Sequence, residues 1–309
     1  MKYIWAFLAA LSLAGLALFF WHYSQTKSNP TPPKPETTQT ASSEKSDNQP
    51  TPTDDIVSEE YSVSHDDKQL YGKITAPSDY KSKKLPTIVI AHGLNNTLEQ
   101  YEMYSQLLAK QGYLVYSFDF YGGSRQSKSG GQDMLNMSVK TELTDLTQVM
   151  EKLSSETFVD KSKMSLFGAS QGGVVASLYA AAYPDRVHKL MLIFPAFVLF
   201  DDAKETYHEL GSPDFDQLPD SLTHHNTTLG KIYLIDALNI DIQAEQAKIT
   251  APTLIIHGTD DAVVPYQYSV EASQTIPNAE LVTVEGGEHR IDERFAITAA
   301  PAIQKFLKE

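Results

Sequence analysis

A serine with glycines on both sides stands at a position in this sequence from which it could act as a nucleophile. Ser170 is the centre of the Gly-x-Ser-x-Gly sequence at residues 168–172, between a short apolar run (164–167) and an apolar helical pattern (174–182). A serine in a sharp turn between a strand and a helix is exposed near the positive end of that helix, and the glycines permit the strained turn. The pentapeptide alone also fits a glycine-rich turn with a bystander serine, so its partners decide between the two interpretations.

The partners that a serine nucleophile needs follow later in the chain. A general base must take the hydroxyl proton, and a carboxylate must orient that base. Asp260 and Asp261 follow the apolar run 253–256, and His289 follows the run 281–284. Of the nine histidines, only His289 lies beyond Asp261, and the order serine, acid, histidine is typical of a nucleophile in a strand–helix turn. These residues predict a serine hydrolase in which either aspartate could be the acid.

Composition excludes several other chemistries. The chain contains no cysteine, so neither a cysteine nucleophile nor a lipoprotein anchor is available. A dehalogenase would need a carboxylate nucleophile where this chain has Ser170. The formal net charge of −14 repels phosphate and disfavours nucleic acid as a partner. His224 and His225 are adjacent and form a weak metal pair at best, so we predict no metal and no other cofactor.

The elements that must position these residues form an alternating pattern. From residue 56 to residue 309, short apolar runs alternate with helical patterns, which is typical of an α/β fold with parallel strands and crossover helices. The chain is expected to open with a hairpin of residues 61–64 and 69–74. The further expected strands are 87–91, 114–118, 164–167, 189–194, 253–256 and 281–284, and the expected helices are 98–111, 139–153, the pattern after Ser170 and 292–307.

One insertion, residues 196–247, interrupts the alternation. It is expected to be irregular, and it carries ten acidic residues against two lysines, a net charge of 2 − 10 = −8. An insertion at the carboxyl edge of the sheet would lie over the site as a lid. A solvated surface excursion is the alternative, although long loops of this kind are usually functional. Because the candidate triad lies outside it, this lid should select substrates rather than take part in bond cleavage.

The N-terminal part has a different character. Residues 1–23 contain a nearly unbroken apolar run with aromatic residues at both ends, long enough to cross a bilayer. Bulky residues occupy its end, where a signal peptidase requires small ones, so an uncleaved transmembrane signal-anchor is favoured over a cleaved signal peptide. Residues 24–55 are rich in Pro, Thr and Ser and predict a disordered linker. We expect a membrane-anchored protein with an extracytoplasmic catalytic domain at a bacterial cell surface; a secreted protein is the alternative.

Several short motifs together resemble the α/β-hydrolase fold. They are the sequence 92–94 (His-Gly-Leu), the Ser170 pentapeptide, the turn 258–265 and the sequence 287–289 (Gly-Glu-His), and the match covers about residues 61–306. The resemblance implies a mostly parallel eight-stranded sheet with helices on both faces and a lid insertion after the sixth strand. Within this superfamily the chain is similar to lidded serine hydrolases, namely bacterial cinnamoyl (feruloyl) esterases, serine aminopeptidases and monoacylglycerol lipases.

The resemblance also implies roles for particular residues. The family pattern Gly-x-x-Asp-x-x-Val falls on Gly258, Asp261 and Val264, so Asp261 rather than its neighbour would be the triad acid with Ser170 and His289. The backbone N–H groups of Leu94 and Gln171 would form the oxyanion hole. The loop containing His92 and Gly93 would contact the substrate.

The function expected from these observations is hydrolysis of small or medium acyl esters, with hydroxycinnamoyl esters as one candidate class. A serine aminopeptidase, whose acidic lid would bind a substrate amine, and a monoacylglycerol lipase are the enzyme alternatives. A non-catalytic binding protein that kept the fold is the remaining alternative. The sequence indicates neither the natural substrate nor an oligomeric state.

Overall fold

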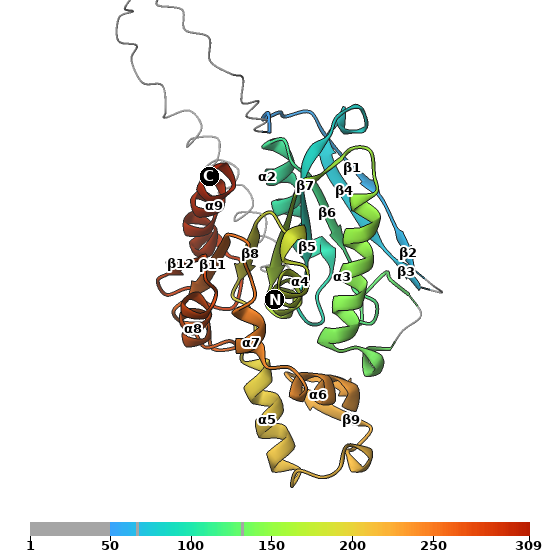
Figure 1. Cartoon of the computed structure of the whole chain (residues 1–309), viewed down its shortest axis with the longest axis vertical. Helices are drawn as coiled ribbons and strands as arrows, with labels where there is room; N and C mark the ends of the chain where they lie inside the picture. The colour runs from blue at the N-terminus through green and yellow to red at the C-terminus, as the bar shows by residue number, and fades with distance from the viewer. Residues whose placement is uncertain (1–49, 66–67, 131–132) are drawn as a thin grey trace, which may run out of the picture.

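Eight strands form one sheet in the computed structural model, which describes residues 50–65, 68–130 and 133–309 (Figure 1). The predicted membrane segment 1–23 and residues 24–49 of the predicted linker lie outside the described residues. Within the part of the chain that the structure describes, no helix is both long and apolar enough to span a bilayer. The strand order across the sheet is β1-β4-β6-β5-β7-β8-β11-β12.

The sheet is parallel except at β4, which runs antiparallel to both of its neighbours, β1 and β6. The predicted α/β-hydrolase sheet of eight mostly parallel strands is therefore confirmed. The strands of this sheet are β1 (Ile56–Glu60), β4 (Gly72–Pro77), β5 (Leu85–Ala91), β6 (Leu114–Phe118), β7 (Val159–Ala169), β8 (Leu190–Ile193), β11 (Thr253–Gly258) and β12 (Ala279–Val284).

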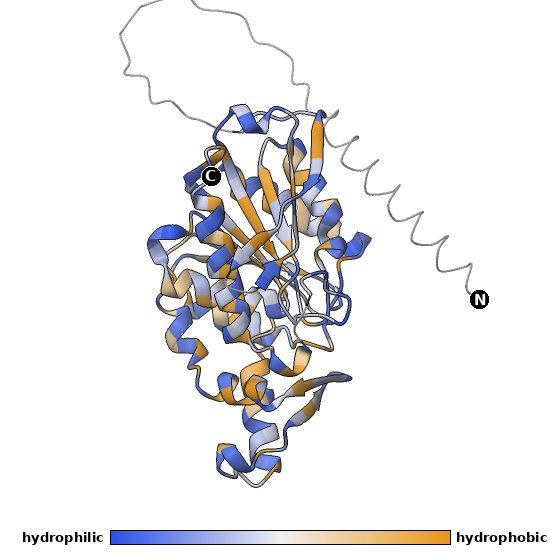
Figure 2. Cartoon of the chain, turned by 90° about the vertical axis from the view of Figure 1, so that its right-hand side faces the viewer, coloured by the Kyte–Doolittle hydropathy of each residue, from blue (hydrophilic) through white to orange (hydrophobic). Residues whose placement is uncertain are grey.

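Helices cover both faces of the sheet. Successive side chains of a strand point to opposite sides, so the apolar strands present apolar side chains on both faces, and the helices bury them. In β5, Ile88 and Ile90 belong to one core with apolar residues of α2 and α9, whereas Val89 and Ala91 belong to a second core with residues of α3, α4 and α8. The strands accordingly form the apolar centre of the domain in Figure 2. These helices are α2 (Glu102–Lys110), α3 (Val139–Ser154), α4 (Gln171–Ala182), α8 (Gln267–Thr275) and α9 (Glu293–Lys308).

Side-chain caps fix where two of the long helices begin. The Ser138 hydroxyl accepts the N–H of Thr141, whose own hydroxyl accepts the N–H of Ser138, so α3 starts with a reciprocal capping box. Asp292 caps α9 by accepting the N–H of Phe295. The remaining short helical turns are η1 (Tyr80–Ser82), η2 (Leu98–Tyr101), η3 (Met134–Asn136) and η4 (Pro184–Arg186).

The insertion 196–247 follows β8, which is the sixth strand of the sheet in chain order, but it is not irregular as predicted. It contains helices and a hairpin that lie together at one end of the domain (Figure 1). The hairpin turn is built by His225 and Asn226, which both have positive φ. The elements are α5 (Leu199–Glu209), η5 (Phe215–Gln217), β9 (Ser221–His224), β10 (Thr227–Gly230), α6 (Lys231–Leu238) and α7 (Ile242–Gln246).

The opening of the domain also differs from the prediction. The predicted hairpin is present only as a small separate ladder between β2 (Val63–His65) and β3 (Lys68–Leu70). The edge strand β1 was not predicted, because its second half, Ser58 to Glu60, is polar and acidic. An edge strand with one exposed face tolerates such residues, and the pairing of β1 with β4 is what recruits it into the sheet.

Candidate active site

Ser170 lies between the last residue of β7 and the first residue of α4, as the strand–turn–helix pattern predicts. Its backbone has φ 53° and ψ −123°, a conformation that is strained for any residue with a side chain. Neighbouring backbone approaches closely: a Cβ on Gly172 would lie 2.2 Å from the carbonyl oxygen of Ala91. Only glycine fits there, so the turn is held tightly and the Ser170 hydroxyl is presented at the carboxyl edge of the sheet.

A chain of two hydrogen bonds connects Ser170 to a histidine and an aspartate from other strands. His289 Nδ1 lies 2.6 Å from Asp261 Oδ2, and because the carboxylate can only accept, this nitrogen carries the proton. His289 Nε2 is then free to accept from the Ser170 hydroxyl, 3.0 Å away. Asp261 follows β11 and His289 follows β12, so the parallel sheet brings together residues that are 119 and 28 positions apart. This arrangement can move a proton from the serine to the imidazole.

Asp261 is the buried member of the aspartate pair. Its Oδ1 accepts the backbone N–H groups of Val263 and Val264, at 2.9 and 2.8 Å. Burial opposes the charged carboxylate, but hydrogen bonds from His257, His289 and Val264 hold the pKa of Asp261 well below its usual range. Asp260 is exposed and contacts the hydroxyl of Thr259. Of the two aspartates that the residues left open, the structure places Asp261 against the histidine.

His257 is a second histidine on the same carboxylate, and the sequence reasoning missed it. Its Nε2 donates to Asp261 Oδ2 at 3.1 Å and to the carbonyl of Val264 at 3.0 Å, while Nδ1 accepts the Ser269 hydroxyl at 2.6 Å. The side chain is fully buried. His257 therefore positions Asp261. The one available signal was its place near the end of the apolar strand β11, three residues before Asp260.

Phe194, directly after β8, was also not predicted as a site residue. It has a positive φ of 35°, and its ring centroid lies 4.4 Å from that of His289. The same ring packs on Phe295 of α9 at 5.3 Å. Phe194 thus packs against the imidazole and restricts its movement. An off-pattern φ at an apolar residue cannot be read from sequence, so no signal for it existed.

The two residues whose backbone N–H groups are predicted to form an oxyanion hole both lie near Ser170: Gln171 follows it in the chain, and Leu94 follows Gly93, which approaches it. Within the described ranges, neither the N–H of Leu94 nor that of Gln171 has a backbone or side-chain acceptor. Gly93 brings the first loop against the turn, since a Cβ there would lie 3.0 Å from the Cβ of Ser170. Two unpaired donors beside a nucleophile are the arrangement that stabilises a tetrahedral oxyanion.

His92, which was predicted to contact the substrate together with Gly93, makes its polar contacts within the protein. Its side chain is 1% exposed. Its Nδ1 donates to the carbonyl of Gly93 at 2.8 Å, and its Nε2 accepts the N–H of Phe120 at 3.0 Å. Burial lowers the pKa of His92, which favours this neutral form. His92 therefore ties the loop of Gly93 and Leu94 to the loop after β6 and leaves no polar atom for a substrate.

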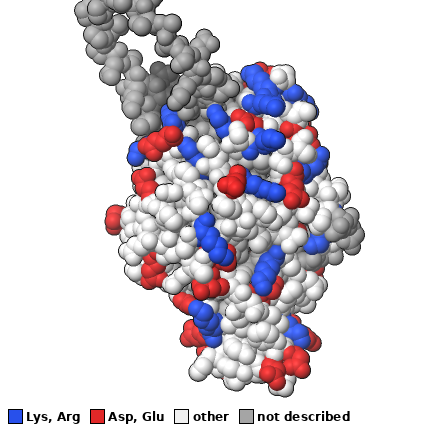
Figure 3. Space-filling view, in the orientation of Figure 1, with Lys and Arg blue, Asp and Glu red and all other residues white. Residues whose placement is uncertain are grey.

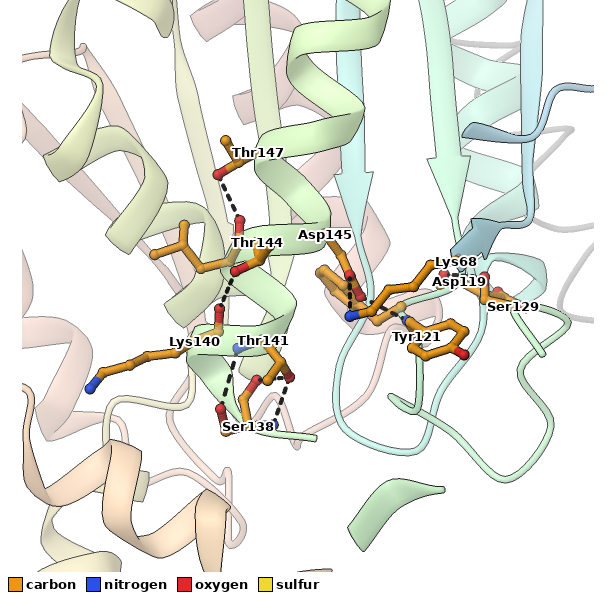
Figure 4. Close-up of polar contacts among 12 residues, drawn as sticks. Lys68, Asp119, Tyr121, Ser129, Ser138, Lys140, Thr141, Thr144, Asp145 and Thr147 are labelled. Atoms are coloured by element: carbon orange, nitrogen blue, oxygen red, sulfur yellow. Dashed lines mark hydrogen bonds and ion pairs between the residues drawn. The ribbon is translucent and has the colours of Figure 1, made fainter. Parts of the chain in front are cut away.

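Asp119 and Asp145 hold the loop after β6, which His92 connects to the loop of Gly93 and Leu94 (Figure 4). Asp119 accepts the backbone N–H groups of Leu98 and Lys128, both at 2.8 Å. Asp145 of α3 accepts the N–H of Tyr121 at 2.9 Å and lies 3.8 Å from Lys68 Nζ. Burial raises the pKa of Asp145 to about 6, against the opposing effects of Tyr121 and Lys68. This loop therefore depends on a carboxyl group whose charged form is disfavoured by burial.

This raised pKa predicts a pH dependence of stability. Between the ordinary carboxyl pKa and about 6, the folded protein holds a proton on Asp145 that the unfolded chain releases, so stability is full below pH 4 and decreases as pH rises towards 7. The decrease from this group should be about 3 kcal/mol. Asp145→Asn should remove it while keeping an acceptor for Tyr121. Urea unfolding at pH 4 to 7 measures it as a growing difference between variant and wild type. Parallel curves, as expected for the exposed Asp79→Asn, would contradict the prediction.

One group of potential metal ligands is present in the described part of the chain. Asp202 of α5 lies near His224 and His225, with the three ligand atoms within 4.8 Å of one another and His225 Nε2 3.8 Å from Asp202 Oδ2. The fold thus adds a carboxylate to the histidine pair seen in the sequence. Tetrahedral zinc brings its ligand atoms to about 3.3 Å, so the cluster is wider than a formed zinc site. Burial lowers the pKa of His224 to about 4.

Comparisons with known proteins agree with this geometry. The model of the family described as serine aminopeptidase, S33, matches residues 82–210 and 217–292, which is more than half of the chain and includes all three residues of the hydrogen-bonded chain. The chain belongs to the serine aminopeptidase S33 family. As a member of this family it is an enzyme, an α/β-hydrolase of the serine hydrolase type, and the predicted superfamily is confirmed.

Individual relatives are distant but cover most of the chain. It is similar to Est1E from Butyrivibrio proteoclasticus, whose structure was solved with ferulic acid bound, with 26% identity, a TM-score of 0.69 and coverage of 80% of this chain and 97% of that one. The bifunctional esterase/perhydrolase DCH of Acinetobacter calcoaceticus is 23% identical over 74% of this chain and 94% of its own length. Human monoacylglycerol lipase ABHD6 is 23% identical over 74% of this chain and 76% of its own.

Proposed function

We propose that this S33-family protein is a carboxylic-ester hydrolase with Ser170 as nucleophile, His289 as general base and Asp261 as the orienting acid. The observation that carries the proposal is the hydrogen-bonded chain from the strained Ser170 through His289 to the buried Asp261. The three residues follow three different strands, β7, β11 and β12, so their hydrogen bonds are not a consequence of closeness in sequence. The backbone N–H groups of Leu94 and Gln171 are the proposed oxyanion hole.

The reaction follows from these positions in two halves. The Ser170 oxygen attacks the acyl carbonyl while its proton passes to His289 Nε2, and the carbonyl oxygen, now negative, is held by the N–H groups of Leu94 and Gln171. The tetrahedral intermediate collapses as His289 gives that proton to the leaving alcohol. In the second half, His289 takes a proton from water, the hydroxide attacks the acyl-enzyme, and Ser170 is regenerated as the carboxylic acid leaves.

Small or medium acyl esters, including hydroxycinnamoyl esters, are the proposed substrates. Support comes from the relative bound to ferulic acid and from the esterase activity in the name of the Acinetobacter relative. Aromatic and apolar side chains border the candidate site, with Phe194 against His289 and Leu94 packed on an apolar cluster that includes Met134 and Leu229. Such surroundings favour an apolar acyl group over a charged one.

The aminopeptidase alternative rests on the family name and on the acidic insertion. The structure weakens the electrostatic part of that argument, because several of these acids are already paired with lysines. On the face shown in Figure 3, basic side chains lie beside acidic ones at the end of the domain formed by the insertion. The pairs are Lys204 with Asp201, Lys231 with Asp220, Lys140 with Asp236 and Lys248 with Glu245.

A substrate panel on the full-length chain tests the proposal. It consists of p-nitrophenyl esters of increasing acyl length, methyl ferulate, a monoacylglycerol and aminoacyl anilides. The ester proposal expects the largest kcat/KM among the short and aromatic esters. Highest activity on the anilides would establish the aminopeptidase alternative, and highest activity on the monoacylglycerol would establish the lipase alternative.

We further propose that residues 1–23 anchor the protein in a membrane with the catalytic domain outside the cytoplasm. The proposal rests on the apolar run and its aromatic ends. Because the long polar linker separates this run from the domain, deleting residues 1–24 should give a soluble enzyme with unchanged kcat/KM. Fractionation of full-length and truncated chains measures this. A full-length protein found in the soluble fraction, with its N-terminus beyond Tyr23, would instead identify a cleaved signal peptide.

A further inference from the structure

A tyrosine of the insertion reaches the residue that follows the nucleophile. Tyr233 of α6 donates its hydroxyl proton to Gln171 Oε1 at 2.8 Å. At its other end the same amide donates from Nε2 to Glu142 Oε2 of α3, also at 2.8 Å. All three side chains are buried. The side chain of Gln171 is thus held from two sides, by an element of the insertion and by an element of the main domain.

The directions of these hydrogen bonds are fixed by the chemistry of the groups. Burial raises the pKa of Glu142 well above its usual range, against the opposing effect of the hydrogen bond from Gln171. The Oε2 of Glu142 is the atom that accepts from the Gln171 amide. The Nε2 of Gln171 can only donate, so it must face Glu142, where Met137 Sδ at 3.6 Å is a second, weaker acceptor. The Oε1 of Gln171 therefore faces Tyr233, whose hydroxyl must be the donor.

Tyr233 also belongs to an apolar cluster beside the second proposed oxyanion donor. Together with Met134, Met137 and Leu229 it forms a small apolar cluster on which Leu94 packs. Tyr233 is therefore linked to both proposed donor residues, to Gln171 by a hydrogen bond and to Leu94 through the apolar cluster against which Leu94 packs.

Two further contacts fix the position of α6 relative to α3. Asp236 of α6 accepts the hydroxyl of Ser138 at 2.5 Å and pairs with Lys140 Nζ at 3.3 Å. Ser138 caps α3, the same helix that carries Glu142, and both Ser138 and Lys140 are seen at its start in Figure 4. Tyr233 and Glu142 are therefore fixed relative to each other, which is what a clamp on Gln171 requires.

We propose that Tyr233 is a positioning residue for ester hydrolysis, which holds the oxyanion-hole donors in place through Gln171 and Leu94. This inference rests on the proposed function of the Ser170 site. An oxyanion donor acts only when it lies about 2.7–3.1 Å from the developing charge, and one such donor is worth roughly 100- to 1,000-fold in kcat. A clamp on the side chain of Gln171 limits rotation of the peptide unit that carries this donor. The insertion would then contribute to bond cleavage and not only to substrate selection.

The test compares Tyr233→Phe with Tyr207→Phe in the full-length chain. Tyr207 is a matched control, because it is a tyrosine of the same insertion whose hydroxyl donates to a backbone carbonyl, that of Pro213, at 2.8 Å. Tyr233→Phe should lower kcat about 10-fold on every ester that the enzyme accepts, with KM unchanged. It should weaken inhibition by a boronic acid, a mimic of the tetrahedral intermediate, by the same factor. Tyr207→Phe should match the wild type in both measurements.

A double-mutant cycle guards against a variant that is merely destabilised. Gln171→Met removes both hydrogen bonds of the clamp but keeps the backbone donor. In that background, Tyr233→Phe should cause no further loss of kcat, because its effect is transmitted through the Gln171 amide. Equal 10-fold losses in both backgrounds would overturn the inference, as would wild-type kcat in Tyr233→Phe or a change confined to KM or to one acyl length.

The activities of Ser170→Ala and Tyr233→Phe distinguish a failure of this inference from a failure of the proposed function. If Ser170→Ala is inactive while Tyr233→Phe behaves as wild type, only the positioning role of Tyr233 is wrong. If Ser170→Ala retains activity, the proposed function itself is wrong whatever the tyrosine variants show.

Discussion

Replacing Ser170 by alanine is expected to lower kcat on esters by roughly 10⁴- to 10⁶-fold. The hydroxyl carries the covalent step, and its proton acceptor, His289 Nε2, lies 3.0 Å away. The domain should remain folded, because alanine keeps the Cβ and the turn is held by its surroundings, including the hydrogen bond from the Ser170 N–H to the carbonyl of Ile193 at 3.0 Å. The residual rate should still exceed that in water, since the oxyanion donors remain.

Single-turnover and steady-state assays with a p-nitrophenyl ester measure this loss, and the melting temperature checks the fold. Ser177→Ala is the matched control, because Ser177 lies on the same helix, α4, and its hydroxyl donates only to the carbonyl of Gly173. A fluorophosphonate probe should label wild type and Ser177→Ala stoichiometrically and leave Ser170→Ala unlabelled. Near-wild-type turnover in Ser170→Ala would disprove the nucleophile assignment.

Asp261→Asn should lower kcat by about 10⁴-fold, whereas Asp260→Asn should change it little. Asp261 Oδ2 accepts from His289 Nδ1 at 2.6 Å and from His257 Nε2 at 3.1 Å. An asparagine that kept its oxygen towards the backbone amides would direct an NH₂ group at both histidines. His289 would then have to place its proton on Nε2, where it could no longer accept from Ser170.

The pair of variants is informative because the neighbours differ in environment. Asp260 is exposed, so the variant Asp260→Asn should keep the kcat of the wild type and serves as the control. Asp261→Asn should also alter acid stability. The pKa of Asp261 is lowered in the folded protein, so its contribution is present above about pH 4 and lost as pH falls, and the variant should lack this acid-dependent loss. A larger loss of kcat in Asp260→Asn than in Asp261→Asn would move the acid by one residue.

Local periodicity allowed most of the sheet and its helices to be predicted from sequence. The strands β5, β6, β8 and β11 are short buried runs in a parallel sheet, where both faces are covered and the apolar signal is continuous. The long helices have apolar faces and sequence-readable caps, as at Ser138 and Asp292. In β1 and in the insertion 196–247, fewer residues are buried and the apolar pattern was too weak to predict the elements. The structure shows a strand and several helices there.

The order of Ser170, Asp261 and His289 was readable because each follows a recognisable strand and the chain holds one histidine after the aspartates. The sequence by itself therefore determined the fold class and which residues could form the hydrogen-bonded chain. Tertiary structure alone decided that His92 is a buried connector and that His257 and Phe194 restrain the site, and it placed Asp261, the aspartate implied by the resemblance, against His289. It also decided that Tyr233 reaches Gln171 across 62 residues. Such contacts depend on the direction and burial of side chains from distant elements, and periodicity carries information only about the face on which a residue lies.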